Sequence, residues 1–234
     1  MIAVVDYCKG NLRSVQRGLI DAGADAVITD DPAVIAEAEA VVLPGVGAFA
    51  DAAASMEESG QMAAVRQAII EGKPFLGICL GEHLLYEGGE EGAPDADHPI
   101  DGIGAVPGVA RKLPATDGEG NLYKIPHVGW NSIEFEPGCP LLDGIEPGEY
   151  FYFTHSYVGA DSPYTVATTT HSITFPCVVA PSDRVFGVQF HPEKSSDAGA
   201  KRLRNFLAIV EQVRNEDDTD DEEDIAALLG ADEE

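Results

Sequence analysis

The stretch Pro74-Phe75-Leu76-Gly77-Ile78-Cys79-Leu80-Gly81 decides the fold of this chain. Its apolar run is typical of a short buried strand, and the glycines around Cys79 indicate a sharp turn into a helix from Glu82. Such a turn lifts the side chain at its apex clear of the sheet, and the start of a helix favours a thiolate. Taken alone, a buried structural cysteine in a glycine-rich turn is an equally good interpretation.

The same alternation of strand and helix patterns runs through the first third of the chain. Buried strands are predicted at residues 2–5 and 40–43, and the second of these ends at Pro44-Gly45-Val46-Gly47. Helical spacing of apolar residues follows Asn11 and recurs at residues 48–56 and 62–70. The pattern predicts an α/β fold, an open and mostly parallel sheet with helices on both faces.

Beyond Gly102 the chain changes to short extended segments. We expect antiparallel strands that extend or flank the parallel sheet, at residues 109–113, 130–135, 150–153, 164–170 and 177–180. One more buried strand is predicted at 185–190, and an amphipathic helix at 198–213. These elements form one predicted domain over residues 1–214, followed by an acidic tail at 215–234 that we expect to be disordered.

The charge is unusual for a chain of 234 residues. There are 41 acidic and 14 basic residues, for a net charge of −27, and without the 11 acids of the tail the body still carries −16. Such a surface repels nucleic acid, so a polyanion is excluded as a partner. Concentrated salt would screen this self-repulsion, which suggests a halophilic protein. The alternative is an ordinary acidic protein with a disordered tail.

Cysteine usage and hydropathy describe the cellular setting that we expect. The four cysteines are far apart and form no CxxC pair, which indicates free thiols in a reducing compartment. No cluster of histidine, cysteine and carboxylate side chains has the spacing of metal ligands, so no metal or organic cofactor is predicted. No apolar run reaches the ~20 residues of a membrane span, and the first residues do not resemble a signal peptide. We expect a cytoplasmic protein that does not contact a membrane.

Phe190-His191-Pro192-Glu193 ends the predicted strand at 185–190. A cysteine nucleophile needs a base, and the base needs an orienting carboxylate. His191 and Glu193 can face the same way in extended chain, at the strand end where catalytic groups gather in an α/β sheet. A surface histidine followed by a solvated glutamate is the alternative for this segment alone.

Pro44-Gly45-Val46-Gly47 also follows a predicted strand. Acyl transfer needs backbone N–H groups aimed at the developing oxyanion, and glycines can present them without a side chain in the way. A simple strand-to-helix turn is the alternative. The three segments at three strand ends together favour an acyl-transfer site built on Cys79.

The motifs LPGVG (43–47), GICLG (77–81) and GVQFHPEKS (187–195) occur in this order, and the chain resembles the class I (triad) glutamine amidotransferases, which have a flavodoxin-like fold. DYCKGNLRSV (6–15), PHVGWN (126–131) and FYFTHSY (151–157) are most similar to one subfamily, the HisH glutaminase subunits of imidazole glycerol phosphate synthase. The resemblance covers residues 1–213.

This resemblance implies hydrolysis of glutamine to glutamate and ammonia through a glutamyl thioester on Cys79. His191 would be the base and Glu193 its orienting group, with the oxyanion held by backbone N–H groups of Leu80 and of Val46-Gly47. Ammonia would pass to a separate cyclase subunit, the (βα)8 barrel HisF, in a heterodimer that serves histidine biosynthesis.

Other motif positions carry over residue by residue. The resemblance implies substrate contacts at Glu91, His83, Thr154, His155 and Ser156. It implies a surface for the cyclase at Asn11, Pro126, His127, Trp130, Asn131 and Lys194. A core tryptophan, a turn asparagine and a solvated lysine are the structural alternatives for the second set.

The chain departs from the family directly after the elbow. The family usually continues with Met-Gln, where this chain has Glu82-His83. An imidazole offers fewer hydrogen bonds than an amide, and an acid beside the nucleophile disfavours thiolate, although a first-turn acid also stabilises a helix. Two alternatives therefore stay open: a glutaminase for another synthase, such as an anthranilate or pyridoxal phosphate synthase component, and a regulatory module that kept the fold but lost turnover.

Overall fold

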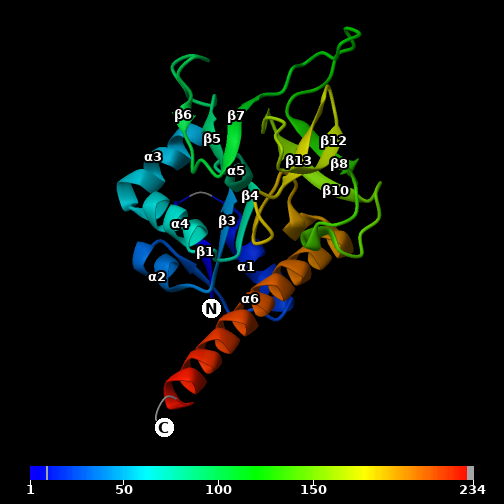
Figure 1. Ribbon diagram of the computed structural model, residues 1–234. Helices are drawn as coiled ribbons and strands as arrows, with labels where there is room; N and C mark the ends of the chain where they lie inside the picture. The colour runs from blue at the N-terminus through cyan, green and yellow to red at the C-terminus, as the bar shows by residue number, and fades with distance from the viewer. Residues whose placement is uncertain (9, 231–234) are drawn as a thin grey trace.

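The computed structural model describes residues 1–8 and 10–230, with side chains described up to residue 216 (Figure 1). Its centre is an eight-stranded sheet in the order β2-β1-β3-β4-β14-β13-β12-β9. The first five pair in parallel: β2 (Ala26–Thr29), β1 (Ile2–Val5), β3 (Ala40–Gly45), β4 (Phe75–Cys79) and β14 (Val185–Val188). The last three join antiparallel: β13 (Thr174–Val179), β12 (Thr165–Thr170) and β9 (Glu134–Phe135). The predicted open, mostly parallel sheet is confirmed.

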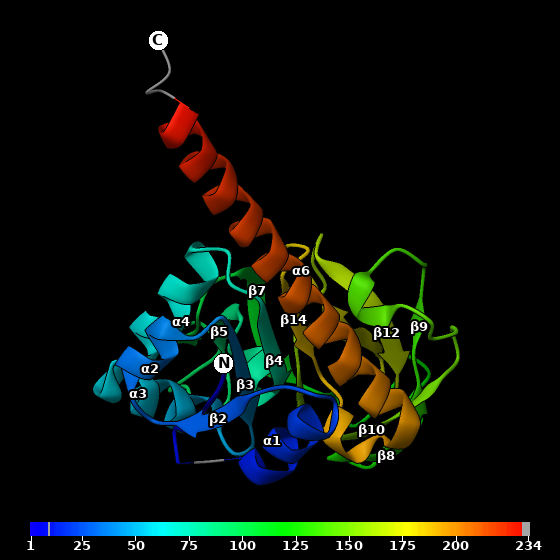
Figure 2. The same ribbon diagram turned by 90° about the horizontal axis from the view of Figure 1, so that it is seen from below.

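Helices cover both faces of this sheet because its strands are apolar on both sides. In β1, Ile2 and Val4 face one core cluster and Ala3 and Val5 face the other. Figure 2 shows α6 (Ser196–Gly230) beside α1 (Leu12–Asp21), and both helices cover the face of the sheet that Ile2 and Val4 line. The opposite side carries α2 (Pro32–Glu37), α3 (Phe49–Ser59) and α4 (Gln61–Ile70). Two of these helices are followed by left-handed glycines, Gly60 and Gly72, as the sequence indicates.

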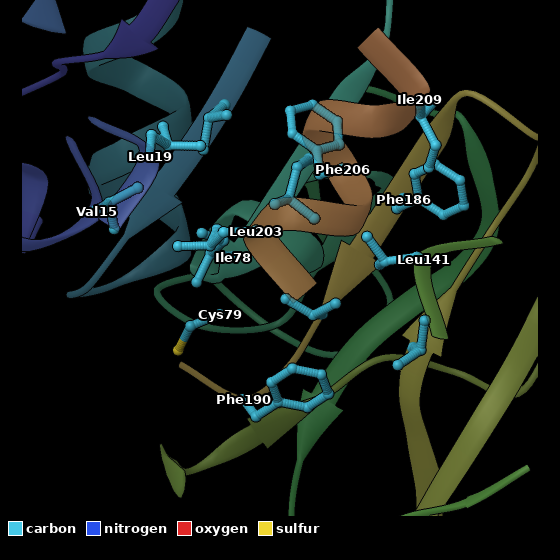
Figure 3. Close-up of a cluster of buried hydrophobic side chains, with 14 of the residues drawn as sticks. Val15, Leu19, Ile78, Cys79, Leu141, Phe186, Phe190, Leu203, Phe206 and Ile209 are labelled. Atoms are coloured by element: carbon cyan, nitrogen blue, oxygen red, sulfur yellow. The ribbon is translucent and has the colours of Figure 1, made fainter. Parts of the chain in front are cut away.

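The cluster under α6 fixes the end of β4. Leu203 and Phe206 from α6 pack over Ile78 and Phe186 of the sheet, with Cys79 at the border of the cluster (Figure 3). All four apolar side chains are buried, and each contributes about 1.5–3 kcal/mol by leaving water. The position of the cysteine is therefore held by the core directly behind it.

Two smaller sheets stand beside the main one (Figure 1). One pairs β10 (Tyr150–His155) with β8 (His127–Ser132), antiparallel. The other has the order β11-β7-β5-β6, from β11 (Tyr157–Val158), β7 (Val106–Lys112), β5 (Tyr86–Gly89) and β6 (Ile100–Asp101). The expectation of flanking antiparallel strands needs one correction, because β7 pairs with β5 in parallel. The chain passes through β6 between these two strands, which allows β7 to return in the direction of β5.

Several element bounds differ from the sequence analysis. β2 and α2 carry no prediction, because β2 is an edge strand whose Val27 is exposed and α2 is only six residues long. The last helix, expected at 198–213, continues to Gly230. Disorder of the acidic segment stays a prediction, and residues 231–234 lie outside the described residues. Among the residues that the structure describes, no helix is long and apolar enough to cross a membrane.

Candidate active site

The three motifs of the sequence meet because their strands are neighbours. β3, β4 and β14 lie side by side, with Gly45 opposite Cys79 and Ile78 opposite Val188. All three strands run in parallel, so their carboxyl ends share one edge of the sheet, where open α/β sheets bind ligands. The prediction that the segments after β3, β4 and β14 come together is confirmed by this register.

Cys79 stands at a strained turn. Its backbone has φ 56° and ψ −108°, a left-handed conformation that costs a non-glycine residue about 1–3 kcal/mol. A Cβ on Gly77 would overlap the carbonyl of Gly81, and a Cβ on Gly81 would overlap the carbonyl of Leu43. Both glycines are thus required by close backbone approach. The helix that follows, α5 (Leu80–His83), has only four residues, so its dipole gives less support to a thiolate than the sequence analysis expected.

His191 and Glu193 form a buried pair in the short 3-10 turn Pro192–Lys194 after β14. Nδ1 of His191 lies 2.9 Å from Oε1 of Glu193, and both side chains are almost fully buried. Burial acts to lower the pKa of His191, but its interactions with Cys79 and Glu193 outweigh burial and raise the pKa to about 9. Burial acts to raise the pKa of Glu193, yet the hydrogen bond from His191 holds it below its ordinary value. The two residues are an ionised pair at neutral pH.

The second ring nitrogen of His191 is available for chemistry. Nε2 is buried and has no hydrogen-bond partner among the described residues. The sulfur of Cys79 lies close enough to raise the pKa of His191 but does not complete a hydrogen bond with Nε2. With Nδ1 committed to Glu193, Nε2 is the atom that can exchange a proton with the thiol.

Ser195 and Tyr152, which the sequence analysis did not single out, hold this turn in place, and Asn11 adds a contact. The hydroxyl of Ser195 donates to the carbonyl of His191 at 2.6 Å and accepts from the backbone N–H of Tyr152 at 3.0 Å. The backbone N–H of His191 donates to the carbonyl of Tyr152 at 3.0 Å. Asn11, predicted at the partner surface, donates to Oε1 of Glu193 at 3.4 Å. A serine directly after a catalytic turn gives no sequence signal of such a role.

A pocket of about 370 Å³ opens in front of Cys79, within the range of small-molecule sites. It brings together all of the predicted substrate and oxyanion residues. Its lining consists of Val46, Gly47, Ala48, Cys79, Leu80, His83, Glu91, Pro126, Thr154, His155, Ser156 and Tyr157. His191 and Glu193 are not among the lining residues, so the nucleophile faces the pocket while its base lies behind it.

Glu91 lies where a charged substrate group could be recognised. Its Oε2 accepts a hydrogen bond from the backbone N–H of Phe49 at 3.1 Å, which fixes the carboxylate at the start of α3. The side chain is half-buried, and burial raises its pKa, with Asp51 adding to the effect and the Phe49 hydrogen bond opposing it. A carboxylate held in this way can accept hydrogen bonds from an ammonium group in the pocket.

The two departures from the family pattern are resolved differently by the structure. His83 lines the pocket, but its Nε2 is 2.8 Å from Oε1 of Gln189, so that nitrogen is already used inside the protein. Glu82 is fully buried, and both of its oxygens lack a hydrogen-bond partner among the described residues. Burial raises the pKa of Glu82 to about 8. Because the carboxyl is neutral at pH 7, it neither repels a thiolate nor acts as a first-turn charge, which corrects both readings of the sequence.

Three of the six predicted partner residues, His127, Trp130 and Asn131, lie on β8 of the two-stranded sheet. On β8, Val128 and Trp130 are more than half exposed, at 56% and 51%, and Lys194 stands 5.9 Å from the centroid of the Tyr152 ring. Asn131 donates to the carbonyl of Thr170 at 2.8 Å. His127 does not fit the predicted cyclase surface, because its side chain is buried.

His127 belongs instead to a buried group of imidazoles. Its Nδ1 lies 3.0 Å from Nε2 of His155, and burial lowers the pKa of His127 to about 4. Among the described residues, no group of three or more histidine, cysteine or acidic side chains is arranged to hold a metal ion.

Two further buried polar groups near Cys79 were not predicted. The hydroxyl of Tyr7 is buried without a hydrogen-bond partner among the described residues, and a Cβ on Gly45 would overlap it. The amide of Gln189 lies 3.8 Å from the sulfur of Cys79. Gln189 does carry a sequence signal, since it is the one polar residue in the run Val185-Phe186-Gly187-Val188-Gln189-Phe190 and a buried polar side chain needs partners.

Comparison with known proteins identifies the family of this chain. The family described as "Glutamine amidotransferase class-I" matches residues 3–210. The "Imidazole glycerol phosphate synthase subunit HisH" of Desulfitobacterium hafniense is 43% identical over 221 residues, which cover 94% of this chain and 97% of the relative. That of Caldanaerobacter subterraneus is 45% identical over 212 residues, covering 90% and 98%. That of Salinibacter ruber is 44% identical, covering 89% and 94%.

Solved structures show the same fold at low sequence identity. A structure titled "Crystal structure of glutamine amidotransferase" superposes with a TM-score of 0.66 at 18% identity, over 90% of this chain and 99% of the other. "Structure of PurLQS from Thermotoga maritima" gives 0.64 at 19% identity, over 91% and 97%. With sequence relatives this similar over nearly their whole length, the chain belongs to the class-I glutamine amidotransferase family, among the HisH subunits of imidazole glycerol phosphate synthase.

Proposed function

We propose that Cys79, His191 and Glu193 hydrolyse glutamine to glutamate and ammonia in this glutaminase subunit. One observation carries the proposal: a cysteine at a strained strand end faces the pocket, and a buried His191–Glu193 pair lies directly behind it. Nucleophile, base and orienting carboxylate in this order are what amide hydrolysis through a thioester requires.

The reaction proceeds in two halves. Nε2 of His191 holds the proton taken from the Cys79 thiol, and the resulting thiolate attacks the amide carbon of glutamine. Backbone N–H groups of Leu80 and of Val46-Gly47 stabilise the resulting oxyanion, and His191 returns the proton to the leaving nitrogen, which departs as ammonia. A water molecule, deprotonated by His191, then attacks the thioester, and glutamate leaves as the thiol is restored.

Substrate contacts are assigned to the pocket wall. Glu91 accepts hydrogen bonds from the α-ammonium group of glutamine, supported by its half-buried and backbone-anchored carboxylate. Thr154, His155 and Ser156, at the junction of β10 and β11, line the pocket, and we assign their backbone to substrate contacts. In this assignment the polar ends of the substrate meet fixed groups, while its amide points to Cys79.

The cyclase partner HisF, a (βα)8 barrel, forms a heterodimer with the surface around β8 and receives the ammonia. Exposed apolar side chains on the two-stranded sheet, Val128, Trp130 and Tyr150, support a docking role, because aromatic residues are enriched in interfaces. Asn131, Lys194, Pro126 and Asn11 complete the assigned contacts. His127 is excluded as a direct surface contact by its burial.

We extend the proposal to the cellular setting. The synthase in which this subunit works acts as a lyase in histidine biosynthesis, and we assign the chain to the cytoplasm of a salt-accumulating cell. The net charge of −27 supports the assignment to a salt-accumulating cell, because concentrated salt screens the repulsion between the acidic residues.

The test mixes the chain with a cyclase subunit and measures glutamate release from glutamine, with and without the cyclase substrate. We expect release to rise when the cyclase docks and again when its substrate is present. Glutamate release that no cyclase changes would contradict the partner assignment, and a pull-down that recovers a different synthase would identify another partner.

A further inference from the structure

A buried glutamine side chain connects the nucleophile to His83. Gln189 directly follows β14, and none of its surface is exposed. Its Nε2 lies 3.8 Å from the sulfur of Cys79, and its Oε1 lies 2.8 Å from Nε2 of His83. We propose that Gln189 is a further catalytic residue that donates a hydrogen bond to the Cys79 sulfur, and that His83 is a positioning residue that selects which end of the amide faces the sulfur.

The short helix after Cys79 makes such a donor necessary. Because α5 spans only Leu80–His83, its dipole stabilises a thiolate weakly. On one side of the sulfur stands His191, and Tyr7 lies near enough that Cys79 contributes to raising the pKa of the phenol. The amide of Gln189 is a further side-chain donor within hydrogen-bond distance of the sulfur, 3.8 Å from it. A donor held there lowers the energy of the thiolate relative to the thiol.

The amide can face the sulfur in two ways, and His83 distinguishes them. Burial lowers the pKa of His83 to about 4, so the ring is neutral at pH 7 and carries one N–H. The ring has two partners, Gln189 and the backbone of Tyr157, and one hydrogen to share between them. The proposal assigns that hydrogen to Nε2, so that the ring donates to Oε1 of Gln189 and the NH₂ group of the amide points to Cys79. The reversed amide would set an oxygen lone pair against a thiolate, which is repulsive.

Glu82 supports this arrangement by staying neutral. Its Oε2 is 3.6 Å from Nε2 of His83, and the carboxyl is sealed in the core near Tyr86 and Cys177. A charged carboxylate at this distance would draw a second proton onto the imidazole. Because burial keeps Glu82 protonated at neutral pH, His83 remains a single donor to Gln189.

The test measures the reactivity of the Cys79 thiol directly, so it does not depend on glutamine turnover. The probe is iodoacetamide, applied over a range of pH. Modification of Cys79 is followed by peptide mass spectrometry, which separates it from modification of the exposed Cys8. Gln189→Met keeps the length of the side chain and removes the donor. We expect the pH of half-maximal alkylation to rise by about one unit and the rate at pH 7 to fall about tenfold.

Matched variants separate a specific role from a structural one. Gln67→Met makes the same chemical change on the exposed face of α4 and should leave the alkylation profile of Cys79 unchanged. His83→Phe removes the N–H that orients the amide and should shift the profile in the same direction as Gln189→Met. His83→Gln restores a donor to Oε1 and should keep the wild-type midpoint, while thermal melting reports whether each variant folds.

Three results would overturn the proposal. An alkylation profile of folded Gln189→Met that superimposes on wild type removes the role of Gln189. A midpoint that falls instead of rising shows that the oxygen of the amide faces the sulfur. Identical behaviour of His83→Phe and His83→Gln removes the positioning role of His83. The glutaminase proposal fails separately, through absent glutamate release, because alkylation needs no glutamine.

Discussion

Two buried glutamates belong to the elements that surround Cys79, the proposed nucleophile, and the protein treats them in opposite ways. Glu193, after β14, accepts from His191 and Asn11, and these partners hold its pKa below the ordinary value despite its burial. Glu82, in α5, has no hydrogen-bond partner for its carboxyl oxygens among the described residues, and burial raises its pKa to about 8. One carboxyl is charged at pH 7 and the other is neutral.

The difference shows that hydrogen-bond partners, rather than burial, decide the charge of an acid in this core. Together with Cys79, Glu193 raises the pKa of His191 to about 9. Glu82 contributes no charge at neutral pH, so it adds bulk and a weak dipole beneath the elbow. Substitutions should therefore separate the catalytic role that we propose for Glu193 from an effect of Glu82 on stability.

The largest effect is expected from removing the sulfur of Cys79, the proposed nucleophile. Cys79→Ala should reduce glutamine-dependent synthesis to background in the assembled complex, because no thioester can form. Ammonia-dependent synthesis should persist, since the cyclase reaction belongs to the other chain. Cys139→Ala, at a half-buried cysteine outside the pocket, is the control and should retain both activities. Loss of both activities in an intact complex would contradict this division of labour.

Glu193→Gln tests the charged member of the pair. The amide keeps the shape of the carboxyl but not its charge, so the pKa of His191 should fall from about 9 toward its ordinary value. Less imidazolium is then present at neutral pH to stabilise the thiolate, and kcat/KM for glutamine should fall about 10²-fold. A pH profile of kcat/KM checks this, and an unchanged profile would show that Glu193 has no electrostatic role.

Glu82→Gln tests the neutral member through stability. Because the folded state raises this pKa from 4.5 to about 8, the folded protein holds the proton more tightly than the unfolded chain does. The stability linked to Glu82 is therefore fully present below pH 4.5 and is lost as the pH rises to about 8. At pH 7 the variant should be more stable than wild type by up to about 3 kcal/mol.

Urea unfolding between pH 5 and pH 8 measures that gain, with Glu134→Gln on the exposed edge strand β9 as the control. The gain should grow with pH for Glu82→Gln and stay flat for Glu134→Gln. A gain of the same size at pH 5 and pH 8 would mean that the carboxyl is not protonated in the folded protein.

Added salt is expected to have the smallest effect on the difference between Glu193 and Glu82. With a net charge of −27, wild type should melt several degrees higher in molar KCl than in dilute buffer, because surface acids repel one another less when screened. Buried groups are screened much less, so the pH dependence of the Glu82→Gln gain should persist in molar salt. Equal melting temperatures of wild type in both conditions would count against halophily.

Much of the fold was predictable because the strands that carry function are buried on both faces. β1, β3, β4 and β14 read as apolar runs, and the residues that follow β3 and β14, or end β4, proved to be neighbours at one edge of the sheet. β2 escaped prediction because an edge strand with exposed Val27 has no such run. Pairing of β7 with β5 depends on long-range register, which local pattern does not contain.

The site divides in the same way. Cys79, His191 and Glu193 were predictable as side chains at strand ends, where chemistry gathers. The protonation state of Glu82 was not predictable, because the sequence does not distinguish a solvated glutamate from a buried one directly after a glycine turn. Gln189 was passed over as part of a strand, and its contact with Cys79 depends on the packing of α5 against β14.

The most direct test of the central claim is covalent labelling with a diazo-ketone analogue of glutamine, read by mass spectrometry in the presence of the cyclase. The account predicts one adduct, on Cys79, that excess glutamine prevents and that Glu193→Gln slows. A chain that binds the cyclase yet forms no adduct on Cys79 would contradict it.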